Sequence, residues 1–508
     1  MVVIGSGFGG ATVACRLARS GARVLVLERG RPWPPQDFPR TPRQWRDALW
    51  APRDGRFGLF DARHFTGMDA LVSSGLGGGS LIYANVILRK DPATFAADGL
   101  PLDATELAPY YDRAEAVIDA RPYPWADRTP KTRALLDAAD GAGLQGELPP
   151  LAIAFGTRPG EALPPGPDVH GGVPRESCRL CGACDVGCRY GAKQTLDFTY
   201  LALAQEAHAQ IRCCCEARAL TPDGSGWRVG YRQHVPAREG AREELLDPVP
   251  EPEREVRADR VVLAGGTFGS TALLLRHRAG LGPLSPRLGH GFSGNGDLLM
   301  FLRRADRMLD PATGPVITAS VSVDDARSPS GRGFLVQDAG APAFSEWLWQ
   351  ALEAPGDLWR AIRRRSAPAA FGTARASAAM MPLLAMGRDV PGGRMELDGD
   401  ELTLRWRPGA SKAYYDGIED TARRLGDALG ATVRRPLGRY TRLITVHPLG
   451  GCPMGTDAGR GVVDDRGRVF GQEGLYVADG SILPGPVGVN PSLTIAALAE
   501  RIAEGMLA

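Results

Sequence analysis

The fold is decided by the stretch Val2-Val3-Ile4-Gly5-Ser6-Gly7-Phe8-Gly9-Gly10, followed by Val24-Leu25-Val26-Leu27-Glu28. These residues predict a buried strand, a G-x-G-x-x-G turn, a helix and a second strand that ends in an acid. Gly5 permits the tight turn, Gly7 lets the backbone approach a pyrophosphate, and Gly10 lets the helix pack on the strand. A diphosphate would meet free N–H groups at the positive end of the helix, and Glu28 would accept hydrogen bonds from a ribose diol. The stretch therefore predicts dinucleotide binding.

Composition excludes several classes of protein. The chain has 508 residues, a net charge of +2 and a hydrophobic content of 44%. This balance argues against a nucleic-acid binder and against a disordered protein. The first strand begins directly after Met1, which leaves no room for a signal peptide, and no later segment offers about 18 uninterrupted apolar residues. We therefore expect a cytoplasmic protein.

The rest of the chain indicates two interleaved domains. Buried strands ending in glycine or an acid return at 260–266 and 474–480, whereas 286–445 carries separated strand-like runs. We expect an α/β fold with a doubly wound, mainly parallel, Rossmann-like domain and a discontinuous second α+β domain on an antiparallel sheet. The expected limits are 1–95, 190–285 and 455–508 for the first domain, and 96–189 and 286–454 for the second, which includes a cysteine-rich loop at 176–190.

Local patterns predict further elements. Residues 31–70 are rich in Pro, Arg and Asp, which is typical of an irregular excursion. The periodicity predicts helices at 104–118, 131–142, 194–208, 270–278 and 410–429, and a last helix that ends at 506.

Four motifs occur in a familiar order. They are the N-terminal fingerprint, the run Gly77-Gly78-Gly79-Ser80, the stretch His447-Pro448-Leu449-Gly450-Gly451 and the stretch Gly488-Val489-Asn490-Pro491-Ser492. With these motifs the chain resembles the glucose–methanol–choline (GMC) family of FAD-dependent oxidoreductases, and within it the cholesterol-oxidase-like branch. The resemblance implies an FAD cofactor and oxidation of a small-molecule alcohol to a carbonyl. It implies a dehydrogenase or an oxidase, with oxygen or a redox protein as electron acceptor.

The resemblance also implies where FAD would lie. The residues expected at the cofactor are Gly5, Gly7 and Gly10 at the diphosphate, Glu28 at the adenosine ribose, Gly78, Ser80, Tyr83, Ala84 and Asn85 along the flavin, Ala217 beside the adenine, Asp479 and Gly480 at the ribityl phosphate, and Pro491 and Ser492 at a helix start facing the flavin. Sterol oxidases of this branch tend to carry Asn-Gly-Gly after the serine, where this chain has Tyr83-Ala84-Asn85. The shape of the pocket beside the flavin is therefore left open, and no isomerase activity is predicted.

His447 and Asn490 match the paired active-site residues of the family. Alcohol oxidation sends a hydride from carbon to flavin N5 while the hydroxyl loses a proton, and a histidine that titrates near neutrality suits the base. We therefore expect His447 to be the base. Asn490 precedes Pro491 and is predicted to cap the last helix, whose positive end would stabilise the reduced flavin.

Four of the nine cysteines, Cys178, Cys181, Cys184 and Cys188, form C-x2-C-x2-C-x3-C. This spacing equals that of the bacterial ferredoxin run without the proline that follows it. An iron–sulfur cluster, a structural zinc site, and disulfides or free thiols all remain open at this point. Cytoplasmic location counts against disulfides.

Two functions are compatible with these patterns. The first is oxidation of a bulky, apolar, steroid-like or terpenoid alcohol. The alternative is a flavin and iron–sulfur electron-transfer protein without an alcohol site. Aromatic and apolar residues between Phe344 and Ile362, followed by Arg363-Arg364-Arg365, form either ordinary core or a lid that contacts a membrane surface.

Overall fold

We describe a computed structural model of the chain, and the description covers residues 1–234, 254–340, 342, 379–435 and 443–508. A five-stranded parallel sheet forms the centre of the first domain. Four of its strands are short apolar runs, as expected for strands buried on both faces, whereas the edge strand at Gln210–Arg212 is mostly polar. In spatial order the strands are β21 (Leu475–Val477), β12 (Val261–Leu263), β1 (Val2–Ile4), β2 (Leu25–Leu27) and β8 (Gln210–Arg212).

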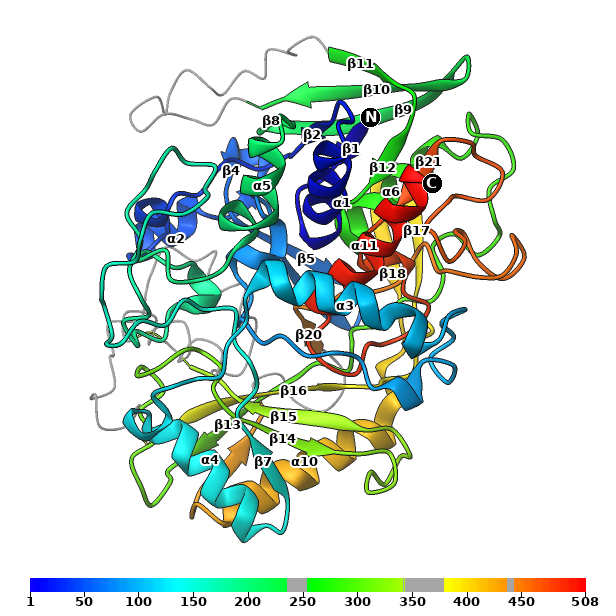
Figure 1. The fold of residues 1–508 in the computed structure, drawn as a ribbon. Coiled ribbons are helices and arrows are strands. Elements are labelled where there is room, and N and C mark those ends of the chain that lie inside the picture. The colour runs from blue at the N-terminus through cyan, green and yellow to red at the C-terminus, as the bar shows by residue number, and fades with distance from the viewer. Residues whose placement is uncertain (235–253, 341, 343–378, 436–442) are drawn as a thin grey trace.

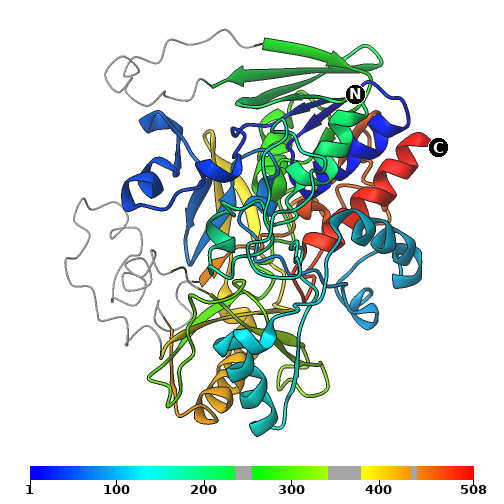
Figure 2. The same ribbon diagram turned by 60° about the vertical axis from the view of Figure 1, so that its left-hand side comes forward.

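The two ends of the chain meet at this sheet. Helix α1 (Phe8–Arg19) packs against the C-terminal helix α11 (Ser492–Leu507), which also contacts α3 (Ala104–Ile118). Figures 1 and 2 show α1 and α11 side by side, with both termini at the same edge of the molecule. An ion pair between Arg16 and Glu500 joins the two helices at 2.6 Å. The parallel sheet and its helices confirm the predicted Rossmann-like architecture.

A six-stranded antiparallel sheet forms the second domain. Helices α4 (Pro130–Gly141) and α10 (Lys412–Asp427) cover the face of this sheet that is turned away from the parallel sheet (Figure 1). The other face is turned toward the first domain. In spatial order its strands are β19 (Thr432–Arg434), β13 (Leu298–Arg303), β16 (Met381–Gly387), β15 (Phe334–Asp338), β14 (Ser320–Val323) and β7 (Gln145–Glu147).

Smaller sheets complete the described part of the chain. The remaining strands are β9 (Cys215–Asp223), β10 (Gly226–Gln233) and β11 (Arg254–Ala258) in one antiparallel sheet, β20 (Leu443–Thr445), β6 (Met68–Ser73) and β5 (Phe60–Phe65) in a mixed sheet, and the pairs β3 (Trp50–Ala51) with β4 (Arg56–Phe57) and β17 (Arg394–Asp398) with β18 (Glu401–Arg405). The remaining helices are α2 (Pro42–Asp47), α5 (Tyr200–Glu206) and α6 (Gly266–His277).

Two local predictions are wrong. Residues 31–70 are not irregular throughout, because they contain α2, β3, β4, β5 and the start of β6. The predicted helix at 194–208 is reduced to a 3₁₀ turn at Leu196–Phe198 and the short α5. The reason is tertiary: the Leu196 N–H donates to the Ser80 hydroxyl, and Thr199 takes a non-helical backbone conformation. These bonds outweigh helical propensity.

Candidate active site

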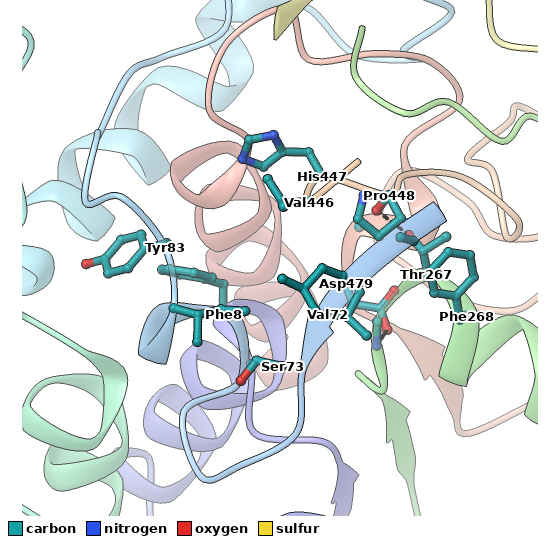
Figure 3. Close-up of a pocket in the computed structure, with 18 of the residues that line it drawn as sticks. Phe8, Val72, Ser73, Tyr83, Thr267, Phe268, Val446, His447, Pro448 and Asp479 are labelled. Atoms are coloured by element: carbon teal, nitrogen blue, oxygen red, sulfur yellow. Dashed lines mark hydrogen bonds between the residues drawn. The ribbon is translucent and has the colours of Figure 1, made fainter. Parts of the chain in front are cut away.

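A cavity of about 620 Å³ is lined by residues of both domains. Its wall includes Gly5, Gly7 and Glu28 of the first β-α-β unit, and also His447 and Asn490. Figure 3 shows how side chains from distant parts of the sequence face this space, among them Phe8, Tyr83, Val72, His447 and Asp479. The two candidate catalytic side chains therefore lie on the same cavity as the dinucleotide fingerprint.

The three glycines of the fingerprint differ in what surrounds them. Gly5 has a φ of +101°, a left-handed conformation that favours glycine. A Cβ on Gly10 would overlap the carbonyl oxygen of Gly5 and press on Ala264, so this glycine permits close packing of α1 on the sheet. A Cβ on Gly7 would meet nothing within 4 Å. Gly7 thus lies at the open space where a diphosphate is predicted.

Glu28 is held rigidly where β2 ends. Its Oε2 accepts hydrogen bonds from the backbone and hydroxyl of Ser6 at 3.0 and 2.6 Å, and its Oε1 accepts one from the Gly30 N–H at 2.8 Å. Burial raises the pKa of the Glu28 carboxyl above its ordinary value. The carboxyl group lies on the cavity wall. Its contact with a ribose diol stays a prediction.

The segment Tyr83-Ala84-Asn85 forms another part of the wall. The Lys193 ammonium supports it from behind by donating to the carbonyls of Tyr83 at 2.8 Å and Leu81 at 3.1 Å. Asn85 is fully buried with a φ of +71°, and its carboxamide has no hydrogen-bond partner in the part of the chain that the structure describes. Such a group is costly unless a ligand satisfies it. Asn85 therefore marks a place where a polar ligand is expected.

Several other predicted cofactor residues share this wall. Those that line the cavity are Gly78, Ala217, Asp479, Gly480, Pro491 and Ser492. The structure places Gly10 and Ser80 behind it: the Ser80 hydroxyl donates to the Gly77 carbonyl at 2.8 Å and accepts from Leu196 at 3.0 Å. These two positions support the wall and do not form it.

Asp479 has a structural role that the sequence analysis missed. Its Oδ2 accepts hydrogen bonds from the Gly266 N–H at 2.9 Å and from the Ser270 hydroxyl, and its Oδ1 accepts one from the Ser481 N–H at 2.9 Å. Gly266 is the first residue of α6, which follows β12. The carboxylate of Asp479, which follows β21, therefore accepts a hydrogen bond from a free N–H group at the start of this helix. This bond explains why α6 begins four residues before the predicted start at 270.

His447 is bonded to a carboxylate. Its Nδ1 lies 2.9 Å from Oδ1 and 3.1 Å from Oδ2 of Asp297, whose side chain is 1% exposed. Asp297 precedes β13 and accepts a further hydrogen bond from the Val446 N–H at 2.9 Å. Since Nδ1 is engaged by the carboxylate, Nε2 is the ring nitrogen left for chemistry in the cavity.

Asn490 is bonded to Gln337 of β15 and does not cap α11. The Gln337 Nε2 donates to the Asn490 Oδ1 at 3.1 Å, and both side chains are buried. The N-cap of α11 is Pro491, and no side chain caps this helix, so the predicted capping role of Asn490 is wrong. The Asn490 Nδ2 also donates to the Gln337 Oε1 at 3.5 Å, so the amide oxygen and one N–H of Asn490 are engaged by Gln337, and the second N–H is left to donate into the cavity.

Sequence analysis missed Asp297 and Gln337. Asp297 follows the run Ser293-Gly294-Asn295-Gly296 directly before the apolar strand β13, and a polar, glycine-broken turn at a strand start is a weak signal. Gln337 directly follows the apolar run Phe334–Val336 in β15, and a buried polar residue in a strand is a signal that could have been used.

Comparisons with known proteins agree with this geometry. A GMC oxidoreductase family model matches residues 357–499, and an NAD(P)-binding Rossmann-like domain model matches residues 3–32. The chain is 31% identical to a cholesterol oxidase of Mycobacterium tuberculosis over 99% of this chain and 90% of that protein. The chain belongs to the GMC oxidoreductase family. Paromamine 6'-oxidase of Streptomyces fradiae is 29% identical over 100% of this chain and 91% of its own length.

The fold of this GMC oxidoreductase also has a solved counterpart. Pyridoxine 4-oxidase from Mesorbium loti superposes with a TM-score of 0.63 at 21% identity, over 99% of this chain and 98% of that one. The protein is thus an FAD-dependent oxidoreductase that acts on CH–OH groups. The cavity fits FAD on its own evidence, because it offers open space beside Gly7, a fixed carboxyl at Glu28 and the carboxamide of Asn85, which has no partner among the described residues.

The four clustered cysteines of this GMC oxidoreductase are not arranged as a metal site in the part of the chain that the structure describes. Within the described residues, no three His, Cys, Asp or Glu side chains converge as metal ligands would. Cys178 and Cys184 are buried and pack in an apolar cluster with Val86 and Leu151, whereas Cys181 is exposed. Burial raises the pKa of the Cys184 thiol to about 12. The predicted iron–sulfur or zinc centre is therefore not supported.

Among the helices that the structure describes, none combines the length and apolar character needed to cross a bilayer. The proposed lid at 344–365 lies outside the described residues.

Asp185 should make the stability of the protein depend on pH. This carboxyl lies on the cavity wall, its Oδ1 has no partner in the described chain, and burial raises its pKa to about 7. Between the ordinary value of 3.8 and about 7 the folded state binds a proton that the unfolded state has lost, so stability falls as pH rises through this window. At pH 8, Asp185→Asn should therefore unfold at a higher urea concentration than the wild type, and its free energy of unfolding should be higher by about 2 kcal/mol.

The comparison should be repeated at lower pH and on a control. The advantage of Asp185→Asn should shrink as pH falls through about 7 and should vanish below the ordinary value of 3.8, where the wild-type carboxyl is neutral in both states. Asp427→Asn, at the exposed end of α10, should show no comparable pH-dependent gain. An equal gain for Asp185→Asn at every pH would contradict the burial argument.

Proposed function

We propose that this GMC oxidoreductase oxidises a bulky, apolar alcohol of steroid-like or terpenoid type to its carbonyl. The observation that carries this proposal is the wall that the antiparallel domain contributes to the cavity. Around His447 and Asn490, that wall is aliphatic and presents Leu299, Val316, Ile317, Ala339 and Leu384. An apolar wall of this kind binds a large hydrocarbon by burying its surface and leaves few polar groups to orient the hydroxyl.

His447 and Asn490 would have different roles in the oxidation of the alcohol. The Nε2 atom of His447 takes the hydroxyl proton, since Nδ1 is bonded to Asp297. The second N–H of Asn490 donates to the alcohol oxygen, because the amide oxygen and the other N–H are held by Gln337. FAD, when bound, accepts the hydrogen and electron pair that leave the alcohol carbon, so that a carbonyl remains. The aliphatic wall excludes water from this centre.

The family sets aside the alternative of a pure electron-transfer protein, because its members act on CH–OH groups. Cholesterol oxidases among the relatives support the choice of a sterol-like alcohol. The relatives also include paromamine and pyridoxine oxidases, so the test must include those alcohols. We propose oxygen or a redox protein as the electron acceptor.

A substrate panel tests the proposal. The purified holoenzyme would be assayed with sterols, terpenoid alcohols, long-chain alcohols, paromamine and pyridoxine, each with oxygen and with an artificial electron acceptor. We expect the highest kcat/KM for a polycyclic or terpenoid alcohol, in step with the aliphatic wall. Turnover confined to paromamine or pyridoxine would overturn the proposed substrate class. A faster reaction with oxygen than with the artificial acceptor would identify an oxidase.

A further inference from the structure

The segment Ser293–Asp297 contacts the side chain of His447 and the backbone of the loop that leads to Asn490. It lies directly before β13, and its Ser293, Asn295 and Asp297 are all buried. Asp297 reaches His447, and Asn295 reaches the loop that leads to Asn490. Because His447 and Asn490 come from separate parts of the chain, one short segment between them can set their relative placement.

Asp297 acts as a hydrogen-bond acceptor from several directions. Its Oδ2 accepts from the Val446 N–H at 2.9 Å and lies 2.9 Å from the Thr445 hydroxyl. Its Oδ1 lies 2.9 Å from the His447 Nδ1. An ionised carboxylate can only accept, so the proton of a neutral imidazole must be on Nδ1. The Nε2 atom then carries the lone pair, as a base requires.

Other ionisable groups surround the carboxylate. Asp389, Tyr414 and Tyr415 interact electrostatically with Asp297 from neighbouring elements. Burial raises the pKa of Asp389 to about 6 and holds both phenols protonated. Asp389 accepts hydrogen bonds from the Ser293 hydroxyl and, at 3.1 Å, from the Gly294 N–H. The segment is therefore also fixed by a buried carboxyl group that does not line the cavity.

The side chain of Asn295 fixes the position of Asn490 by bonding to the backbone of the loop just before it. Its Oδ1 accepts from the N–H groups of Val487 at 2.9 Å and Gly488 at 3.1 Å, and its Nδ2 donates to the Val489 carbonyl at 2.9 Å. These are the three residues before Asn490. Asn295 adopts a φ of +52°, an uncommon conformation for a residue other than glycine, which these three bonds can hold.

We propose that Asp297 is a positioning residue that holds His447 in the tautomer whose Nε2 lone pair faces the cavity. The same segment, through Asn295, sets the position of Asn490 opposite it. The use of that lone pair as the base rests on the proposed function. The tautomer itself follows from the contacts of Asp297 and can be measured without a substrate.

The test is an isosteric change, Asp297→Asn. The new amide oxygen must face the Val446 N–H, so its NH₂ group takes the place of Oδ1 and donates to His447 Nδ1. The proton of the neutral ring then moves to Nε2. Nitrogen NMR on protein labelled at its seven histidines reads the two ring nitrogens directly, and a His447→Gln sample assigns the signal. We expect Nδ1–H in the wild type and Nε2–H in Asp297→Asn, with at least about a 100-fold loss of turnover.

A double-mutant cycle separates positioning from general damage. If Asp297 acts through His447, Asp297→Asn should cost no further turnover in a His447→Gln background. Asp197→Asn is the matched control, since Asp197 is bonded to the buried His170 at 2.7 Å and neither residue lines the cavity. We expect Asp197→Asn to retain turnover, although its unfolding midpoint should change about as much as that of Asp297→Asn.

The results of these experiments either support or overturn the assignment of Asp297 as a positioning residue. An unchanged His447 tautomer in Asp297→Asn, or losses that multiply in the double variant, would overturn the assignment. If Asp297→Asn folds poorly, the wild-type spectrum still decides the matter, because Nε2–H in the wild type would overturn it by itself. Absence of turnover with every apolar alcohol would count against the proposed function and would leave the tautomer result standing.

Discussion

Replacing His447 with Gln is expected to lower kcat by about 1,000-fold while the protein remains yellow. The Gln amide can still donate toward Asp297, so the buried carboxylate keeps a partner, but the side chain offers no basic atom to the cavity. Alanine would remove the base and also leave that carboxylate short of a donor, which mixes two effects. Steady-state turnover of an alcohol identified in the substrate panel gives the loss. The anaerobic rate at which the alcohol bleaches the flavin shows that the chemical step is affected.

His170→Gln provides the matched control for this experiment. The His170 side chain is 4% exposed and bonded to Asp197, as His447 is to Asp297, but it does not line the cavity. We expect a lower unfolding midpoint with near wild-type turnover. Equal losses of turnover in the two variants, or full turnover in His447→Gln, would refute the assignment of His447 as the base.

The parts of the fold that depend on neighbouring residues could be predicted from sequence. The β1-α1-β2 unit is local, and the roles of Gly5 and Gly10 follow from steric limits that hold in any such turn. The later strands β12 and β21 are short apolar runs that end in Gly or Asp, a pattern that only a sheet buried on both faces explains. Pairing parallel strands from both ends of the chain then brings the fingerprint and α11 together.

Contacts between distant residues could not be predicted in the same way. The parallel pairing of β6 with β20 joins segments more than 370 residues apart, whereas its antiparallel pairing with β5 is a local hairpin that the Pro-, Arg- and Asp-rich composition of 31–70 obscured. The capping role given to Asn490 is locally reasonable but loses to a hydrogen bond from Gln337 on another domain. The bond between Asp297 and His447 likewise joins positions 150 residues apart. In each case tertiary partners decide the outcome, and a single sequence does not name them.

The cysteine run shows the opposite error, in which a strong local pattern was given too much weight. Its spacing suits a cluster, but the loop turns Cys178 and Cys184 into an apolar core and leaves Cys181 exposed. Ligand spacing alone does not determine whether the thiols converge, because that depends on how the loop packs.

Gly7→Val is expected to yield a folded but colourless protein. A Cβ at this position meets nothing within 4 Å, and the backbone of Gly7 has a φ of −70°, so valine is compatible with the protein itself. The branched side chain would instead occupy the space predicted for the diphosphate at the start of α1. An overlap of this size costs about 1–3 kcal/mol or more, which weakens FAD binding by about 5- to 150-fold or more. Flavin absorbance per protein and circular dichroism would be measured together.

Two neighbouring positions make this prediction specific. A Cβ on Gly9 would overlap the carbonyl of Ala478 at the end of β21, so Gly9→Val should fail to fold, because it separates α1 from the sheet. Gly409 also has open space around it, lies just before α10 and does not line the cavity, so Gly409→Val should fold and stay yellow. If Gly7→Val bound FAD as tightly as the wild type, the diphosphate could not lie against this glycine. The placement of the flavin beside His447 would then have to be abandoned.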